Sequence, residues 1–207
     1  MIECITKYFT SLSGAQIDNF SRLKKIYEEW NARINLISRR DFDNFYIRHV
    51  LHSLAIAKII QFNPGTKILD VGTGGGFPGI PLAIMFTDSA FSLLDSVEKK
   101  TRAVSAVASE LGLSNVNVKR GRAEEEKDKY DFVVSRAVME LPGFVKLTRK
   151  NIDSKSFNNL KNGILYLKGG DLTSDLNLFQ KKAAVWELKY LFEEPFFETK
   201  KIVYIPV

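Results

Sequence analysis

The segment from Ile68 to Gly79 constrains the fold of this chain more than any other. It reads Ile-Leu-Asp-Val-Gly-Thr-Gly-Gly-Gly-Phe-Pro-Gly, an apolar run that closes on Asp70-Val71 and is followed by five glycines in eight residues. Glycine loses more backbone entropy on folding than other residues, so this density is tolerated where the main chain needs positive φ or lies against something bulky. The segment therefore predicts a strand that runs into a ligand-binding loop.

The chain beyond residue 63 alternates short apolar runs with helical stretches. We expect strands at residues 67–71, 90–94, 116–118, 130–134, 164–167, 185–192 and 201–205, and helices at 78–86 and 96–111. This alternation predicts an α/β fold, a mostly parallel sheet with helices on both faces. The last two strands leave no room for a helix between them, so they should pair antiparallel at one edge.

The first part of the chain has a different pattern. From Ile17 to Ile34, apolar residues recur at spacings of three and four, which is typical of a helix with one buried face. Asn63-Pro64-Gly65 is a turn signal. We therefore expect a helical extension at residues 1–62 and an α/β domain at 63–207, which a chain of 207 residues can pack as one unit.

Composition limits the functions open to the chain. Cys4 is the only cysteine, and His49 and His52 are the only histidines, so we expect neither a disulfide nor a metal site. The sequence has no secretion signal and no apolar run of the roughly 20 residues that a membrane span needs, so we expect no membrane contact. With a single cysteine we expect a cytoplasmic protein, and we expect it to be a monomer. The net charge of +6 favours an anionic partner, with nucleic acid first.

The glycine loop lies where doubly wound sheets bind ligands, beyond the carboxyl end of a strand. Its Gly74-x-Gly76-x-x-Gly79 spacing satisfies the dinucleotide fingerprint, and Asp95 ends the next strand within reach of ribose hydroxyls, so an NAD-dependent oxidoreductase is one candidate. Asp70 would repel a pyrophosphate but suits the amine of S-adenosylmethionine, although it could also simply cap the loop. The two carboxylates together favour S-adenosylmethionine.

If the ligand is a methyl donor, the absence of certain catalytic motifs limits which atom can accept the methyl group. Pyrimidine C5 needs attack by a thiolate, and Cys4 is far from the sheet in sequence. Residues 133–137 lack the Asp/Asn-Pro-Pro-aromatic segment of exocyclic amine methyltransferases. A ready nucleophile such as guanine N7 remains, which needs positioning and no catalytic acid or base. Arg136, at a strand end, could fork onto the O6 and N7 edge of guanine or onto a carboxylate of the cofactor.

Five motifs resemble those of the glucose-inhibited division protein B family, the bacterial 16S rRNA guanine-N7 methyltransferases. They are DVGTGGGFPGIPL at 70–82, LDS at 94–96, VSRA at 134–137, LKG at 167–169 and RHVLHS at 48–53. The chain departs from the family pattern at His52, where aspartate is usual, and at Gly75, where proline is common. The resemblance covers most of the chain, from Trp30 to the last strand.

The resemblance implies a class I S-adenosylmethionine-dependent methyltransferase fold, Rossmann-like, with seven strands. The implied activity is methyl transfer to N7 of one guanine in 16S rRNA, with the RNA or the small ribosomal subunit as partner. Carried over by motif, the cofactor contacts are Gly72, Gly74, Phe77, Asp95, Ala123, Glu124 and Arg136. A motif or strand end singles out Arg48, His49, Arg136 and Lys168 as RNA contacts. The alternatives are a methyltransferase of another RNA or a small molecule, an NAD-linked oxidoreductase, and a non-catalytic RNA-binding module.

Overall fold

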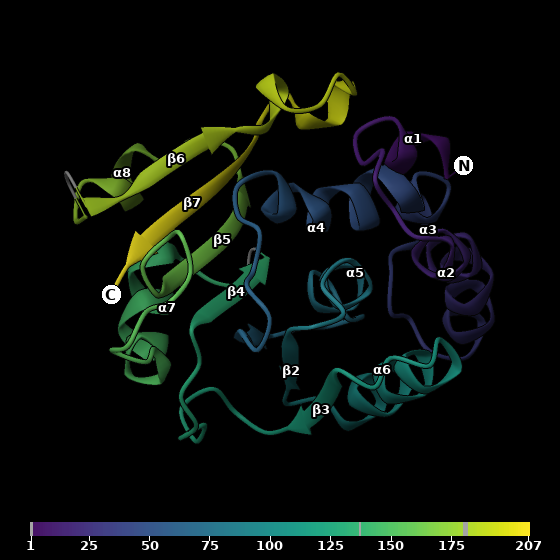
Figure 1. The fold of residues 1–207 in the computed structure, drawn as a ribbon, viewed down its shortest axis with the longest axis horizontal. Helices are drawn as coiled ribbons and strands as arrows, with labels where there is room; N and C mark the ends of the chain where they lie inside the picture. Colours follow the sequence, from purple (N-terminus) through teal and green to yellow (C-terminus); the bar gives the residue numbers. More distant parts are fainter. Residues whose placement is uncertain (1, 137, 180–181) are drawn as a thin grey trace.

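The computed structural model describes residues 2–136, 138–179 and 182–207 of the chain. Within these residues seven strands form one sheet in the order β3-β2-β1-β4-β5-β7-β6 (Figure 1). The strands are β1 (Lys67–Val71), β2 (Ala90–Asp95), β3 (Val116–Arg120), β4 (Phe132–Arg136), β5 (Gly163–Gly169), β6 (Ala184–Glu187) and β7 (Lys200–Pro206). β1 to β5 pair in parallel, whereas β7 is antiparallel to both β5 and β6. The predicted α/β sheet with an antiparallel edge is confirmed.

Among the described residues, the helices range from single turns to five turns of α-helix. They are α1 (Glu3–Thr6), α2 (Gly14–Arg33), α3 (Arg39–Phe42), η1 (Tyr46–Leu51), α4 (His52–Leu54), η2 (Ala55–Lys58), α5 (Gly79–Met85), α6 (Glu98–Glu110), α7 (Leu141–Thr148), η3 (Arg149–Asn151), α8 (Thr173–Leu176), η5 (Leu188–Tyr190) and η6 (Pro195–Phe197). Figure 1 shows α5 and α6 on one face of the sheet and α7 on the other. Helices therefore cover both faces, as the alternation of runs predicts.

One predicted strand is wrong in its length. The run 185–192 is expected to be extended throughout, but β6 ends at Glu187 and Leu188–Tyr190 forms a 3-10 turn. Leu188 and Phe192 are buried, while Tyr190 between them is 78% exposed. A turn brings two apolar side chains four residues apart into one core and leaves the middle one in water, which a straight strand does not do.

The N-terminal helices lie on the same face as α5 and α6 (Figure 1). Helix α2 begins with a capping box, in which the Ser13 hydroxyl accepts a hydrogen bond from the Gln16 amide and the Gln16 side chain accepts one from the Ser13 amide. Phe20 and Leu23 of α2 belong to the same buried hydrophobic cluster as Leu82 of α5. Residues 2–62 therefore extend the core of the sheet.

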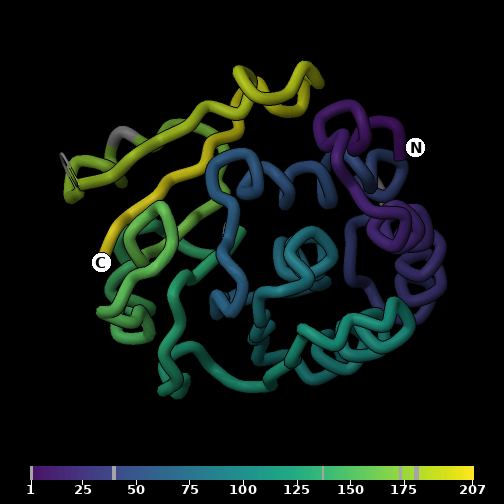
Figure 2. Tube along the Cα trace, in the orientation of Figure 1, coloured from purple at the N-terminus to yellow at the C-terminus, as the bar shows by residue number. Residues whose placement is uncertain are grey.

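The N-terminal segment also contacts the connection between β6 and β7, and Figure 2 shows these two segments side by side. The Tyr8 hydroxyl donates to the Glu194 carboxylate over 3.0 Å, and the Tyr8 ring meets the Phe192 ring edge-on at 4.9 Å. The extension is therefore attached to the antiparallel end of the sheet as well as to α5. Among the described residues, no helix is both long and apolar enough to cross a membrane.

Candidate active site

The glycine loop leaves the carboxyl end of β1 and enters α5. Gly72, Gly74 and Gly76 all have positive φ, between 58° and 91°. A Cβ atom at Gly76 would lie 2.9 Å from the hydroxyl of Tyr27, which donates to the carbonyl of Gly75 over 2.6 Å. Glycine is therefore required at this bend both by its φ and by the approach of α2.

Asp70 fixes this loop by hydrogen bonds to its two ends. Its side chain is fully buried, and its Oδ2 accepts hydrogen bonds from the Thr73 hydroxyl at 2.6 Å and from the Gly79 amide at 2.9 Å. Burial raises the pKa of Asp70 to about 7, against the lowering effect of these hydrogen bonds. The structure therefore confirms that Asp70 caps the loop, one of its two expected roles. Its buried Oδ1 has no hydrogen-bond partner among the described residues, and a contact with a ligand amine stays a prediction. The carboxylate points into the protein and ties the loop to the start of α5.

Asp95 holds the other side of the loop. Its Oδ2 accepts from the Gly74 amide and its Oδ1 from the Val97 amide, both over 2.9 Å. The residue is 8% exposed and its side chain lines a cavity of about 500 Å³ above β1 and β2. Each carboxylate oxygen retains a lone pair, so Asp95 can still accept hydrogen bonds from a diol.

This space, the glycine-loop cavity, has the size of a small-molecule site. It is lined by Val71, Gly72, Gly74, Leu94, Asp95, Ser96, Val97, Lys100, Gly121, Arg122, Ala123, Glu124, Val138, Met139, Phe144 and Leu147. Five of the predicted cofactor contacts are thus brought together, namely Gly72, Gly74, Asp95, Ala123 and Glu124. Its lining combines apolar side chains with glycine main chain and two carboxylates, which suits a nucleoside.

The other two predicted cofactor contacts, Phe77 and Arg136, do not line this cavity. Phe77 is buried in an aromatic cluster, with its ring centroid 5.0 Å from that of Tyr27 and 5.2 Å from that of His49. Its ring also faces the Arg136 guanidinium at 5.3 Å. A direct contact of Phe77 with a cofactor stays a prediction, and in the structure this ring supports Arg136.

A second space, the basic cavity, lies beyond the carboxyl ends of β4 and β5. It has a volume of about 230 Å³ and is lined by Asp41, Arg48, His49, His52, Arg136, Leu167, Lys168, Gly169, Phe196 and Lys200. All four predicted RNA contacts meet here, although they come from η1, β4 and β5. Ala137, the last residue of the VSRA motif, lies outside the described residues.

Arg136 is the most strongly desolvated cation of the basic cavity. Its Nη1 donates to the Arg48 carbonyl at 3.3 Å and its Nη2 contacts His49 Nδ1 at 3.1 Å. Burial lowers its pKa to about 10, although Asp70 acts in the opposite direction. Within the described chain it has no ion pair. Both terminal nitrogens keep a further hydrogen, so the guanidinium can bind an anion.

The two histidines add no charge to the basic cavity. Burial first, and then Arg136, lower the pKa of His49 to about 3. Burial also lowers the pKa of His52, and Arg136 and Lys200 lower it further. Because Nδ1 of the neutral His49 accepts from Arg136, its hydrogen is on Nε2, a buried atom with no partner among the described residues. His52 therefore adds a neutral imidazole to the cavity.

Lys200 is a cavity residue that sequence reasoning missed. Its Nζ lies 4.9 Å from the centre of the Phe196 ring and, in the part of the chain described, forms no ion pair. By contrast, Lys168 is paired with Glu140 and Asp175, and Arg48 is paired with Asp41. Only the register of β7 against β5, which places Lys200 opposite Gly169, brings this side chain to the cavity.

The sequence is similar to that of known proteins along nearly its whole length. The family model described as "rRNA small subunit methyltransferase G" matches residues 16–202. The chain belongs to this family. It is 53% identical over 203 residues to the Ribosomal RNA small subunit methyltransferase G of Bacteroides thetaiotaomicron, covering 98% of both chains. It is 52% identical over 206 residues to that of Christiangramia forsetii, covering 100% of this chain and 97% of that one. The family predicted from the motifs is therefore confirmed.

Solved structures agree on the fold. A SAM dependent methyltransferase from Aquifex aeolicus superposes with a TM-score of 0.55 at 16% identity, covering 75% of this chain and 89% of that one. A mutant of MtNAS in complex with S-adenosylmethionine superposes with a TM-score of 0.57 at 13% identity, covering 92% of this chain and 76% of that one. The Rossmann-like class I methyltransferase fold is confirmed. Among the described residues, no three His, Cys, Asp or Glu side chains are placed to hold a metal ion.

Asp95→Ala tests the glycine-loop cavity directly. The change removes the acceptor of two main-chain hydrogen bonds and of any ribose hydroxyl, so the Kd for S-adenosylmethionine should rise about 10- to 100-fold in calorimetry. Ser96→Ala is the matched control, because Ser96 lines the same cavity and its side chain forms no hydrogen bond in the described structure. An unchanged Kd for Asp95→Ala, or binding of NAD in place of S-adenosylmethionine, would contradict this assignment.

Proposed function

We propose that this protein transfers a methyl group from S-adenosylmethionine to N7 of a guanine in small-subunit 16S rRNA. The observation that carries the proposal is the pair of neighbouring cavities at the carboxyl ends of the strands. The glycine-loop cavity suits the nucleoside of the cofactor, and the basic cavity suits an anionic polynucleotide. Membership of the rRNA small subunit methyltransferase G family supports both assignments.

The side chains of the basic cavity support N7 as the acceptor. Asp41 is already paired with Arg48, and Asp175 with Lys168. Burial keeps His49 and His52 poor bases, because it lowers the pKa of both. When bound, S-adenosylmethionine supplies a methyl group on a sulfonium centre, which a free lone pair accepts without the loss of a proton. A site whose described residues offer no available general base therefore favours a ready nucleophile such as N7 over an amine or hydroxyl.

The chain's own contribution is then positioning. Arg136 and Lys200 supply the positive charge that would bind RNA phosphate or the carboxylate of the cofactor. Phe77 and His49 hold the Arg136 guanidinium in place. The glycine loop, which Asp70 and Asp95 hold by hydrogen bonds, would place the cofactor next to the basic cavity. Holding the methyl group and its acceptor in the reactive geometry removes most of the entropy cost of bringing two reactants together. This effect accounts for much of the rate enhancement in group transfer between two bound reactants.

The test is mass spectrometry of digested 16S rRNA from cells with and without the gene for this protein. Loss of one 7-methylguanosine, restored by the wild-type gene and not by Asp95→Ala, is expected. Purified naked 16S rRNA and assembled small subunits, offered separately with labelled S-adenosylmethionine, distinguish the two forms of the substrate. A full complement of 7-methylguanosine in the deleted strain would refute the proposal.

A further inference from the structure

The connection between β3 and β4 differs from the other parallel crossovers of the sheet. β1 leads to β2 through α5, β2 to β3 through α6, and β4 to β5 through α7. Residues 121–131, all of them described, contain no helix. This crossover loop carries Ala123 and Glu124 to the glycine-loop cavity. A loop without helical hydrogen bonds must be held by other groups if it is to present a fixed surface.

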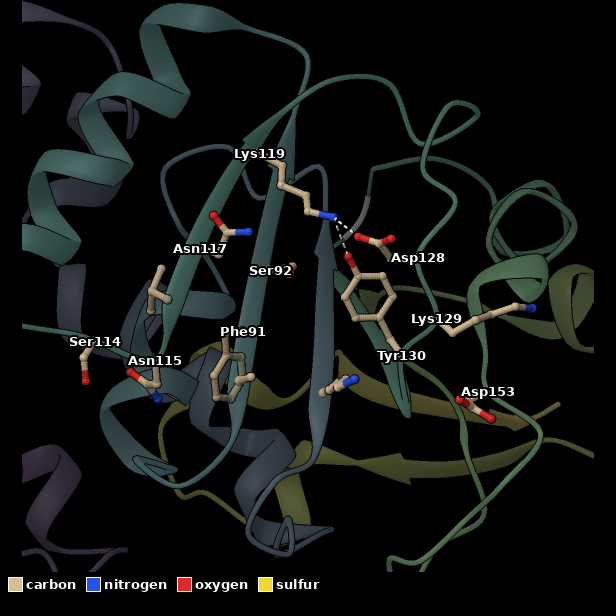
Figure 3. A pocket seen from close by; sticks show the side chains of 13 residues that line it. Phe91, Ser92, Ser114, Asn115, Asn117, Lys119, Asp128, Lys129, Tyr130 and Asp153 are labelled. Atoms are coloured by element: carbon tan, nitrogen blue, oxygen red, sulfur yellow. Dashed lines mark hydrogen bonds and ion pairs between the residues drawn. The ribbon is translucent and has the colours of Figure 1, made fainter.

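One group that fixes this loop is Lys119, from the edge strand β3. Its Nζ donates to Glu126 Oε2 at 3.0 Å, to Asp128 Oδ2 at 2.6 Å and to the Tyr130 hydroxyl at 3.0 Å. Figure 3 shows the Lys119 side chain reaching across the sheet face to Asp128 and Tyr130. An ammonium group has three hydrogens, and here each meets one oxygen of the crossover loop.

The acceptors of Lys119 are themselves fixed. Glu126 is 8% exposed, and its second oxygen accepts from the main-chain amides of Lys127 and Asp128. From η3, the Asn151 amide donates to the carbonyls of Glu126 and Asp128, both over 3.0 Å. The Lys150 ammonium donates to the carbonyl of Glu124 itself. Lys119 and Asn151 therefore hold the middle of the loop, and Lys150, the chain neighbour of Asn151, holds Glu124 at the glycine-loop cavity.

An open cavity borders this network. A cavity of about 540 Å³ lies on the same face of the sheet and is lined by polar side chains that include Ser92, Asn117, Lys119 and Lys67. Figure 3 shows this cavity beside the Lys119 contacts. Tyr130 and Ala123 of the loop pack against the hydrophobic cluster of the sheet. Between these two residues, charged hydrogen bonds hold the loop beside this space.

We propose that Lys119 is a positioning residue for cofactor binding, which holds the crossover loop so that Ala123 and Glu124 form one wall of the nucleoside site. Lys119 itself does not line the glycine-loop cavity, so it acts through the loop. The inference depends on the proposed function, since it concerns the adenosine end of S-adenosylmethionine. According to this inference, the affinity for the cofactor depends on Lys119, a side chain that lines a different cavity from the one that holds the cofactor.

The experiment compares Lys119→Met with Lys67→Met, a matched loss of one lysine from the same open cavity that breaks no hydrogen bond to the loop in the described structure. For Lys119→Met the KM for S-adenosylmethionine and the Kd for adenosine should both rise about tenfold. The kcat at saturating S-adenosylmethionine and the Kd for RNA should stay within about twofold of wild type. Lys67→Met should leave all four unchanged.

A second variant covers the case in which Lys119→Met does not fold. Glu126→Gln keeps an oxygen for the main-chain amides but turns an amide toward Lys119, so it should raise the same KM about threefold with kcat unchanged. A folded Lys119→Met or Glu126→Gln protein with wild-type KM and adenosine Kd would overturn the inference. So would a fall in kcat with unchanged KM. Failure of the wild-type protein to bind S-adenosylmethionine would instead refute the proposed function.

Discussion

Arg136→Met is expected to lower the methylation rate at least about 100-fold, while the free energy of unfolding stays the same or rises. Arg136 is a desolvated cation, and the partners of its hydrogen bonds in the described chain, the Arg48 carbonyl and His49 Nδ1, carry only partial charge. The Asp70 and Asp41 carboxylates favour its charged form but do not offset the burial. Desolvation of such a charge opposes folding, and methionine fills a similar volume without it. Arg136 therefore does not serve stability. Because it lines a cavity at the strand ends, we expect its role to be ligand binding.

The measurements for Arg136→Met are single-turnover methylation of small-subunit RNA and urea unfolding at one pH. Arg136→Lys keeps a charge but not the planar fork, and it should lose most of the activity as well. Arg22→Met is the control, since Arg22 forms an exposed pair with Asp18 at 3.5 Å on α2. Near wild-type activity for Arg136→Met, or a large loss of stability with proportional loss of activity, would show that Arg136 is structural.

Asp70→Asn is expected to change how stability depends on pH. The pKa of Asp70 is raised from 3.8 to about 7 in the folded protein. Below about pH 4 both folded and unfolded states carry the proton, so this group contributes no difference. Between pH 4 and 7 the folded state keeps the proton that the unfolded state has lost, so stability falls as the pH rises. A shift of this size corresponds to at most about 4 kcal/mol.

Asparagine removes this titration and retains an oxygen for the Thr73 hydroxyl and the Gly79 amide. Urea unfolding at pH 5, 6, 7 and 8 should therefore show a stability gain of Asp70→Asn over wild type that grows up to pH 7 and is then constant. His49 and His52 act in the opposite direction, because their lowered pKa favours folding as the pH rises. Their effect cancels in the difference between the two proteins. Asp88→Asn, at an exposed position, should show no such gain, and a constant difference at all four pH values would refute the prediction.

The strands and the glycine loop were predictable because their signals are local. Alternating apolar runs and helical stretches depend on neighbours within about ten residues, and so does the dense glycine of 72–79. The end of β6 was not predictable, because the burial of Leu188 and Phe192 depends on the core they meet. For the same reason, the direction in which Asp70 points was open in the sequence. A buried carboxylate that ties a loop and one that faces a ligand have the same sequence pattern.

The sequence by itself determined the family, the sheet and the residues on either side of the glycine loop. It also placed Arg48, His49, Arg136 and Lys168 among the candidates, since each belongs to a motif or ends a strand. Only the tertiary structure decided that these four meet in one cavity, that Lys200 joins them, and that Lys119 holds the crossover loop. The physical reason is strand register and side-chain direction. The register of β7 against β5 brings Lys200 to the cavity, and the direction of the Lys119 side chain brings it to the crossover loop.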